Sequence, residues 1–156
     1  MLGVKPHKQK PGFCGPASLK MVLDFHGIDI SEDELGNITM CVPEHGVNGA
    51  AIIKAAKKLG FHAFKKDLAE LEDLQFYYEK GLPVIVEWFS ADEAHFSVVV
   101  KIDKHHIYLQ DPELADVRKI ELIAFERIWF GFDTDIMRTK RDLVLRRLIV
   151  IKHLQN

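Results

Sequence analysis

The 156-residue chain changes character near residue 82, and this change limits the folds that it can adopt. Before this point, apolar residues recur at helical spacing in segments that end in glycine, as between Cys14 and Gly27. After it, four runs are rich in β-branched and aromatic residues, as strands are: 83–89, 95–102, 106–110 and 143–152. Helices first and strands later are typical of an α+β fold rather than of alternating βαβ units.

The helical part divides at its glycines and capping residues. We expect coil over residues 1–13, because this segment is rich in proline, glycine and lysine. Ser31 and Glu34 have the spacing of a capping box. The remaining predicted elements are a helix from Cys14, a short helix after Ser31, a helix over 50–60, a strand over 61–64, a helix over 67–81 and a short helix over 122–129.

Length and charge exclude several classes of protein. A chain of this size is expected to form one domain, 1–156. A formal net charge of −2 gives no general attraction to nucleic acid or to anionic membranes. There is no apolar run of the roughly 18 residues of a membrane span, and no signal-peptide core near the N-terminus, so the cytoplasm is the expected location. Two cysteines are too few for a disulfide scaffold.

Cys14 stands where a proline- and glycine-rich coil meets the first turn of a predicted helix. The free N–H groups and the dipole at a helix N-terminus favour a thiolate, and the same N–H groups can donate to an oxyanion. Gln9 lies five residues upstream, and its side-chain amide could supply a second donor. Cys14 is therefore a candidate nucleophile, the alternative being a half-buried cysteine of purely structural role.

His95 is the candidate base, because it begins an apolar strand after a polar loop and can face a cleft. A hairpin centred on Asp103 and Lys104 pairs residues whose numbers sum to about 206 or 207, which places Asp111 opposite His95. Opposed residues of antiparallel strands have Cα atoms about 4.5–5.5 Å apart, so Asp111 can orient the imidazole. Asp103 lies eight residues from His95, roughly 26 Å along a strand, and cannot.

Three segments together resemble the papain-like bacteriocin-processing peptidases, the double-glycine peptidase family: QKPGFCGPASLKMVLDFHG, HFSVVVKIDKHHIYLQDP and FERIWFGF. The resemblance covers Gln9 to about Phe132. It implies a papain-like fold, in which a helical half packs on a small antiparallel sheet. It also implies a cysteine peptidase that works through an acyl-enzyme. Cys14, His95 and Asp111 would be the catalytic residues, and Gln9 with the Cys14 N–H would form the oxyanion hole.

The resemblance further implies a peptide or protein substrate, for which a Gly-Gly-type cleavage site is one option, and a separate transporter as an optional partner. It implies no metal and no cofactor. Two departures from the family bear on the substrate: Phe13 stands where transporter peptidase domains usually carry an acid, and the gap from Gln9 to Cys14 is one residue shorter than in papain. The stretch FCGPASL is also similar to phytochelatin synthases. Peptidyl or acyl transfer, and a leader-peptide-binding domain without activity, therefore remain as alternatives.

Other conspicuous residues are expected to be structural. Cys41 is interpreted as a buried or loop thiol. The segment HGVNGAA, which contains His45, could border the cleft or could be an ordinary loop and helix cap. Because neighbouring strand residues point to opposite faces, His105 and His106 are not expected to chelate a metal. The basic segment 140–152 is expected to be a closing strand rather than a membrane-surface element. The aromatic set is expected in the core: Trp88, Phe89, Trp129, Phe130 and Phe132.

Overall fold

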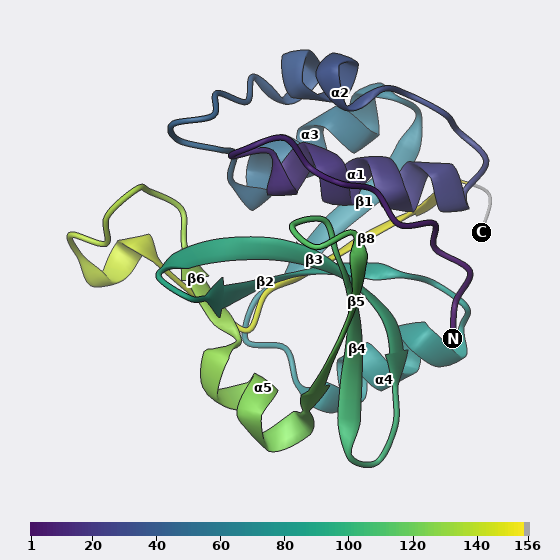
Figure 1. The fold of residues 1–156 in the computed structure, drawn as a ribbon, viewed down its shortest axis with the longest axis vertical. Helices are drawn as coiled ribbons and strands as arrows, with labels where there is room; N and C mark the ends of the chain where they lie inside the picture. Colours follow the sequence, from purple (N-terminus) through teal and green to yellow (C-terminus); the bar gives the residue numbers. More distant parts are fainter. Residues whose placement is uncertain (155–156) are drawn as a thin grey trace.

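The computed structural model describes residues 1–154 and is built around a mixed arrangement of helices and antiparallel sheet (Figure 1). The helices are α1 (Cys14–Phe25), α2 (Glu32–Thr39), α3 (Gly49–Lys58), α4 (Leu71–Glu79) and α5 (Leu122–Ile128), with a 3₁₀ turn η1 (Lys140–Asp142). The strands are β1 (Phe61–Lys66), β2 (Val84–Ser90), β3 (Glu93–Ile102), β4 (His106–Asp111), β5 (Asp116–Glu121), β6 (Phe130–Phe132), β7 (Leu143–Leu145) and β8 (Leu148–His153).

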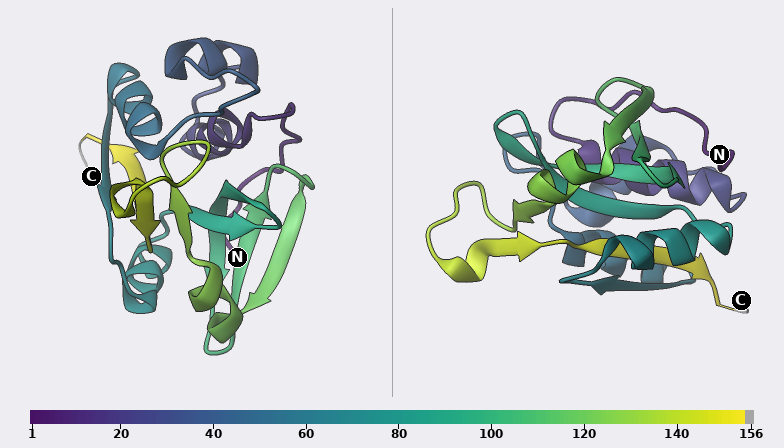
Figure 2. Two further views of the ribbon diagram at one scale, coloured as in Figure 1. Left: turned by 90° about the vertical axis from the view of Figure 1, so that its left-hand side faces the viewer. Right: turned by 90° about the horizontal axis from the view of Figure 1, so that it is seen from below.

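Six strands form one antiparallel sheet in the order β1-β8-β2-β3-β4-β5, and β6 pairs with β7 separately. Along its strands, alternate residues enter opposite cores, as the two-residue period of a strand requires. Ile85 belongs to the core under α1 and α3, whereas Val84 and Val86 belong to the core under α4 and α5. Figures 1 and 2 show the helical layers on the two sides of the sheet. The predicted α+β class is confirmed.

The first helix begins at Cys14, as predicted, and its chain reverses at Gly27, where φ is +87°. The oxygen of Ser31 accepts a hydrogen bond from the N–H of Glu34, so Ser31 caps α2. Within residues 1–154, no helix combines the length and the apolar character that crossing a membrane requires. The helical half thus follows the sequence pattern closely.

Two predicted elements need correction, and one strand was missed. The closing strand is interrupted, because Arg146 has a φ of 47° and the side chain of Arg147 is buried among acids. The fourth helix begins at Leu71 instead of residue 67, because the side chain of Asp67 is held by Arg147 and Leu68 has a positive φ. Strand β5 was not predicted, since its sequence DVRKIE is mostly polar and leaves most of its side chains at least partly accessible.

The register of the β3–β4 hairpin also differs from the prediction. Val98 pairs with Gln110 and Ile102 pairs with Ile107, so partner numbers sum to 208 or 209 instead of 206 or 207. A bulge between Val99 and Lys101 separates the two values, because it adds one unpaired residue to β3. The predicted direct opposition of His95 and Asp111 is therefore wrong, although the two side chains still meet, as the next section describes.

Candidate active site

The segment before Cys14 is fastened to the helical layer. The backbone N–H of Lys10 donates to the buried carboxylate of Glu32, 3.1 Å from Oε2, and the N–H of Phe13 donates to the Lys10 carbonyl. Gly12 has a φ of +77°, and a Cβ added there would lie 2.2 Å from the carbonyl oxygen of Pro43. Only glycine fits this left-handed turn against the loop, and the turn delivers Cys14 to the first residue of α1.

Cys14 is half-buried at the N-terminus of α1, where no side chain caps the helix and no acid occupies the first turn. Free backbone N–H groups and the positive end of the helix dipole therefore surround the thiol. Gly15 follows, and a Cβ there would come within 2.3 Å of the Val47 side chain. The missing side chain thus lets the loop before α3 approach the start of α1.

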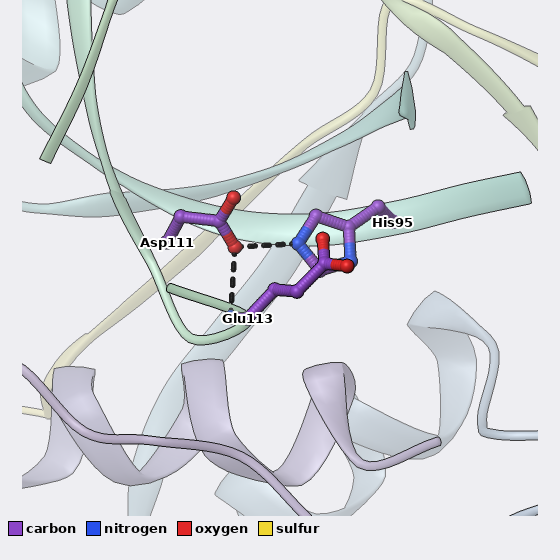
Figure 3. Close-up of side chains that lie close together, drawn as sticks. All are labelled: His95, Asp111 and Glu113. Carbon is purple, nitrogen blue, oxygen red and sulfur yellow. Dashed lines mark hydrogen bonds and ion pairs between the residues drawn. The ribbon is translucent and has the colours of Figure 1, made fainter. Parts of the chain in front are cut away.

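His95 lies near the start of β3, and its side chain is 3% exposed. Its Nε2 lies 2.6 Å from Oδ1 of Asp111, the last residue of β4 (Figure 3). The indole of Trp88 meets the imidazole edge-on at a centroid distance of 5.6 Å, and the Trp88 N–H donates to the Ser97 hydroxyl. Packing and hydrogen bonding together therefore fix the orientation of the His95 ring.

The charges at this site depend on one another. Burial alone would lower the pKa of His95, but the Asp111 carboxylate and the nearby Cys14 thiol outweigh burial and raise it to about 10. Burial alone would raise the pKa of Asp111, but hydrogen bonds from His95, Arg118 and the Glu113 N–H hold it at about 2. Near neutral pH the pair is therefore an imidazolium beside a carboxylate.

Arg118 on β5 is the residue that sequence reasoning missed at this site. Its Nε donates to Oδ2 of Asp111, and its guanidinium lies over the indole of Trp88, 5.7 Å from the ring centroid. Arg118 thus touches both residues that position His95. Nothing in the sequence indicated Arg118, because the strand that carries it, β5, was not predicted.

Gln9 reaches the site through the backbone. Its N–H donates to the carbonyl of Pro112, at 2.9 Å, so the segment before Cys14 is tied to the residue after Asp111. The Gln9 side-chain amide lies 3.3 Å from the Lys10 carbonyl, and its Oε1 is buried without a hydrogen-bond partner among residues 1–154. Gln9 and Cys14 both line a cavity of about 450 Å³. The structure therefore brings all four predicted residues into one region.

One group of potential metal ligands occurs in the described chain: His95, Asp111 and Glu113, whose ligand atoms lie within 4.8 Å of one another (Figure 3). Both oxygens of Asp111 already accept hydrogen bonds, from His95, Arg118 and the Glu113 N–H. The Glu113 carboxylate lies 3.6 Å from Arg118. We interpret the group as a hydrogen-bonded ion cluster in which Arg118 supplies the cation.

This geometry has a counterpart among known proteins. Residues 7–139 match the model of the Peptidase C39 family. The chain belongs to the Peptidase C39 family. The match includes every residue of the candidate site, and family membership supports a peptidase role.

Relatives of this C39 chain include a much longer protein and one of similar length. It is 30% identical over 107 residues to the lacticin-481/lactococcin-DR transport/processing ATP-binding protein of Lactococcus lactis, covering 67% of the chain but only 15% of that protein. It is 32% identical over 125 residues to an uncharacterized protein of Methanothermobacter marburgensis, covering 80% of the chain and 82% of the relative. One of these two relatives is therefore much longer than the chain, and the other is of similar length.

The solved structure of the peptidase domain of Streptococcus ComA, a bifunctional ABC transporter of a quorum-sensing pathway, has the same fold. It superposes with a TM-score of 0.77 at 24% identity, over 96% of the C39 chain and 98% of the domain. The papain-like fold implied by the sequence resemblance is therefore confirmed.

The other conspicuous residues have varied surroundings. Burial raises the pKa of the Cys41 thiol to about 11, and its Sγ lies 3.6 Å from the Gly12 carbonyl. His45 is exposed and pairs with Asp135 across the mouth of the cavity, at 2.5 Å. Trp88 and Trp129 are core residues as predicted, whereas Phe132 lines the cavity and Phe89 stacks on Phe130 at the surface of the core.

His105 and His106 lie at the tip of the β3–β4 hairpin, where their backbone N–H groups donate to Oδ1 of Asp103. Their role there is to close the turn. Asp103 is thus at the far end of the hairpin from His95, as predicted.

Proposed function

We propose that this C39 protein is a cysteine peptidase with Cys14 as nucleophile, His95 as base and acid, and Asp111 as the group that orients His95. The observation that carries this proposal is the buried His95–Asp111 pair, with Cys14 near enough to His95 to help raise its pKa. Nε2 of His95 is hydrogen-bonded to Asp111, so Nδ1 is the ring nitrogen that is available to the Cys14 thiol. The thiolate is the reactive form of cysteine, and His95 is the group that takes the thiol proton.

The reaction proceeds in two halves. The Cys14 sulfur forms a bond to the carbonyl carbon of the peptide, and the electron pair of the C=O bond moves to the oxygen. The C–N bond then breaks as His95 gives its proton to the departing amine, which leaves a thioester on Cys14 and a neutral imidazole. A water molecule attacks the thioester, His95 takes its proton, and the carboxylic acid product leaves as the thiolate re-forms.

The oxyanion is stabilised by two donors, the backbone N–H of Cys14 and the side-chain amide of Gln9. The first is free because the opening turn of a helix has no intrahelical partner for its N–H groups. The second is near because the N–H of Gln9 is fixed to the Pro112 carbonyl. Substrate has only to draw the amide away from the Lys10 carbonyl, which it contacts at 3.3 Å.

Arg118 acts as a positioning residue through Asp111. Its guanidinium keeps the carboxylate ionised and fixes its rotamer, so that Asp111 presents one oxygen to His95. Arg118 is partly exposed to solvent, whereas Asp111 and His95 are buried.

We propose peptides as substrates, with transport-linked leader peptides as the first class to test. The Lactococcus lactis and Pediococcus acidilactici relatives are named transport/processing ATP-binding proteins, and the chain spans 15% and 16% of them. The experiment incubates the protein and a Cys14→Ala variant with peptides that contain a Gly-Gly pair, and follows products by mass spectrometry. Cleavage by the parent alone supports the proposal.

Adding a competing amine or thiol to the same reaction separates hydrolysis from transfer. We expect the carboxylic acid to remain the main product. A product that carries the added nucleophile in place of water would make the protein a transferase, and cleavage that survives in Cys14→Ala would overturn the assignment of the nucleophile.

A further inference from the structure

The cavity beside Cys14 has an acidic lining. Five acids line it and, among its described lining residues, there is no lysine or arginine; the acids are Glu44, Glu87, Glu93, Asp133 and Asp135. The cavity lies between the loop before α3 and the segment after β6, so the acids come from both sides. Acidic surface alone is common on proteins, but Glu87 differs from the other four acids because it is buried.

Glu87 is the buried acid of this cavity. It lies in the apolar strand β2, is 2% exposed, and neither of its carboxylate oxygens has a hydrogen-bond partner among residues 1–154. A Cβ on Gly131 would come within 2.2 Å of Glu87 Oε2, so the backbone of β6 passes directly against one side of the carboxylate. Buried carboxylates without partners are costly, and they indicate a missing group.

The neighbouring charged side chains do not hydrogen-bond to Glu87. Arg147 donates to Asp67 at 2.6 Å and to Asp133 at 3.0 Å, but its nearest nitrogen is 3.8 Å from Glu87. Lys65 adds a second cation, 2.6 Å from Asp67. The two cations therefore bind Asp67 and Asp133, and Glu87 is the acid without a hydrogen bond.

Glu87 is also close to the reacting groups. It lines the same cavity as Cys14. Its cross-strand partner Phe96 lines that cavity too, and a Cβ on Gly15, the residue after Cys14, would lie 3.7 Å from the Phe96 side chain. Cross-strand partners lie about 4.5–5.5 Å apart at Cα, and an extended peptide advances about 3.3 Å per residue. A side chain within a few residues of the scissile bond can therefore reach Glu87.

Resting on the proposed peptidase function, we propose that this cleft selects peptides with a basic side chain, lysine or arginine, near the scissile bond, and that Glu87 is the residue that recognises it. The ammonium or guanidinium donates to the unpartnered carboxylate and supplies the missing positive charge. Asp133 lines the same cavity and adds to the attraction.

The ionisation of Glu87 is consistent with this role. Burial raises its pKa to about 8, with Asp133 and Asp67 adding to the effect and Arg147 opposing it. The empty cleft therefore holds a neutral acid near pH 7. An arriving cation favours the ionised form, so the basic peptide binds with release of a proton.

The test uses ten-residue peptides with a central Gly-Gly pair, in which one position at a time carries lysine or its uncharged counterpart norleucine. Each pair competes in one reaction, and mass spectrometry gives the ratio of their kcat/KM values. At one or two positions we expect lysine to be favoured by about tenfold or more, equivalent to ~1.4 kcal/mol. In Glu87→Gln this ratio should fall close to one.

Glu93→Gln is the matched control, because it removes one charge from the exposed rim of the same cavity. The lysine preference should survive in that variant. A ratio near one at every position in the parent, an unchanged ratio in Glu87→Gln, or an equal loss in Glu93→Gln would overturn the proposal.

A binding measurement separates this proposal from the peptidase assignment. Calorimetric titration of the Cys14→Ala protein with each lysine and norleucine pair needs no turnover. If no peptide is cleaved by the parent but lysine peptides bind Cys14→Ala more tightly, and Glu87→Gln in that background abolishes the difference, basic-peptide recognition stands and the peptidase assignment fails. Equal affinities for every pair would overturn the recognition proposal itself.

Discussion

His95 and Asp111 share a 2.6 Å hydrogen bond although the strands that carry them are not in the register that would oppose them. Extending the Val98–Gln110 pairing would put residue 113 opposite His95. Asp111 ends β4, where its carboxylate accepts hydrogen bonds from Arg118 and the Glu113 N–H as well as from His95, and Trp88 packs against the imidazole ring. The pair therefore depends on β5 as well as on its own hairpin.

Substitution of Asp111 should damage activity, whereas substitution of Asp103 at the far end of the hairpin should not. Asp111→Ala should lower kcat by about a hundredfold or more, since the imidazolium loses its partner, and Asp111→Asn should retain partial activity. Because Asp111 raises the pKa of His95, the basic limb of the pH–rate profile should move to lower pH in Asp111→Ala. Steady-state kinetics across pH 5–10 measures both effects. Asp103→Ala is the control, and equal damage there would disprove the role of Asp111.

Replacing Arg118 should change the pH dependence of kcat/KM while the protein remains folded. Arg118→Met keeps a side chain over Trp88 but removes the cation that lowers the pKa of Asp111. We expect the acidic limb of the kcat/KM profile to move to higher pH and Arg118→Lys to restore most of the shift. Arg127→Met, on the exposed side of α5, should leave the profile unchanged. A uniform loss of activity in Arg118→Met without any shift would indicate a structural role only.

Gln9 can be tested by removing its amide. Gln9→Ala should lower kcat by about a hundredfold with little change in KM, because the lost hydrogen bond forms to the oxyanion and not to the resting peptide. Gln75→Ala, on the surface of α4, is the matched control and should be neutral. If Gln9→Ala raised KM and left kcat unchanged, Gln9 would be a substrate-binding residue instead of an oxyanion donor.

Glu87 should make the stability of the protein fall as pH rises. Its pKa is raised from about 4.5 in the unfolded chain to about 8 in the folded one, so the folded state binds the extra proton between these values. The stabilisation is present in full below pH 4.5 and is lost as pH rises through 8. Glu87→Gln does not lose this stabilisation. Between pH 4.5 and pH 8, the free energy of unfolding of the variant should therefore rise relative to that of the parent by more than ~1 kcal/mol.

Urea unfolding at the two pH values measures this difference, with Glu93→Gln as the control because that side chain is exposed. If the difference between Glu87→Gln and the parent did not depend on pH, the Glu87 carboxyl would be in a solvated environment and not a buried one.

The sequence was most informative where a residue and its local element suffice. The helix start at Cys14 is such a local feature and was predicted. The strand that was predicted to begin at His95 begins two residues earlier, at Glu93, and Asp111 was chosen through a hairpin register that proved wrong. The register of the hairpin was wrong because the turn centres between Lys104 and His105, so that Ile102 pairs with Ile107; the bulge between Val99 and Lys101, which left no mark in the residue pattern, changes the register again. Strand β5 was missed because its alternation is polar, and Arg118 was missed with it.

The buried charges were missed for a different reason. Asp67, Glu87, Asp133 and Arg147 come from four separate segments, and only the folded sheet brings them together. One signal was available in the sequence: Glu87 is a single acid inside the apolar run VIVEWF. Such a residue is either paired or functional, because an isolated buried charge is not stable.

The most direct test of the central assignment is the alkylation of Cys14 by a peptide chloromethyl ketone, followed by intact mass and peptide mapping at pH 6. The account predicts one adduct on Cys14, formed at least tenfold more slowly in His95→Ala, and none on Cys41, whose pKa burial raises to about 11. Equal rates in the parent and His95→Ala, or modification of Cys41 in preference to Cys14, would contradict it.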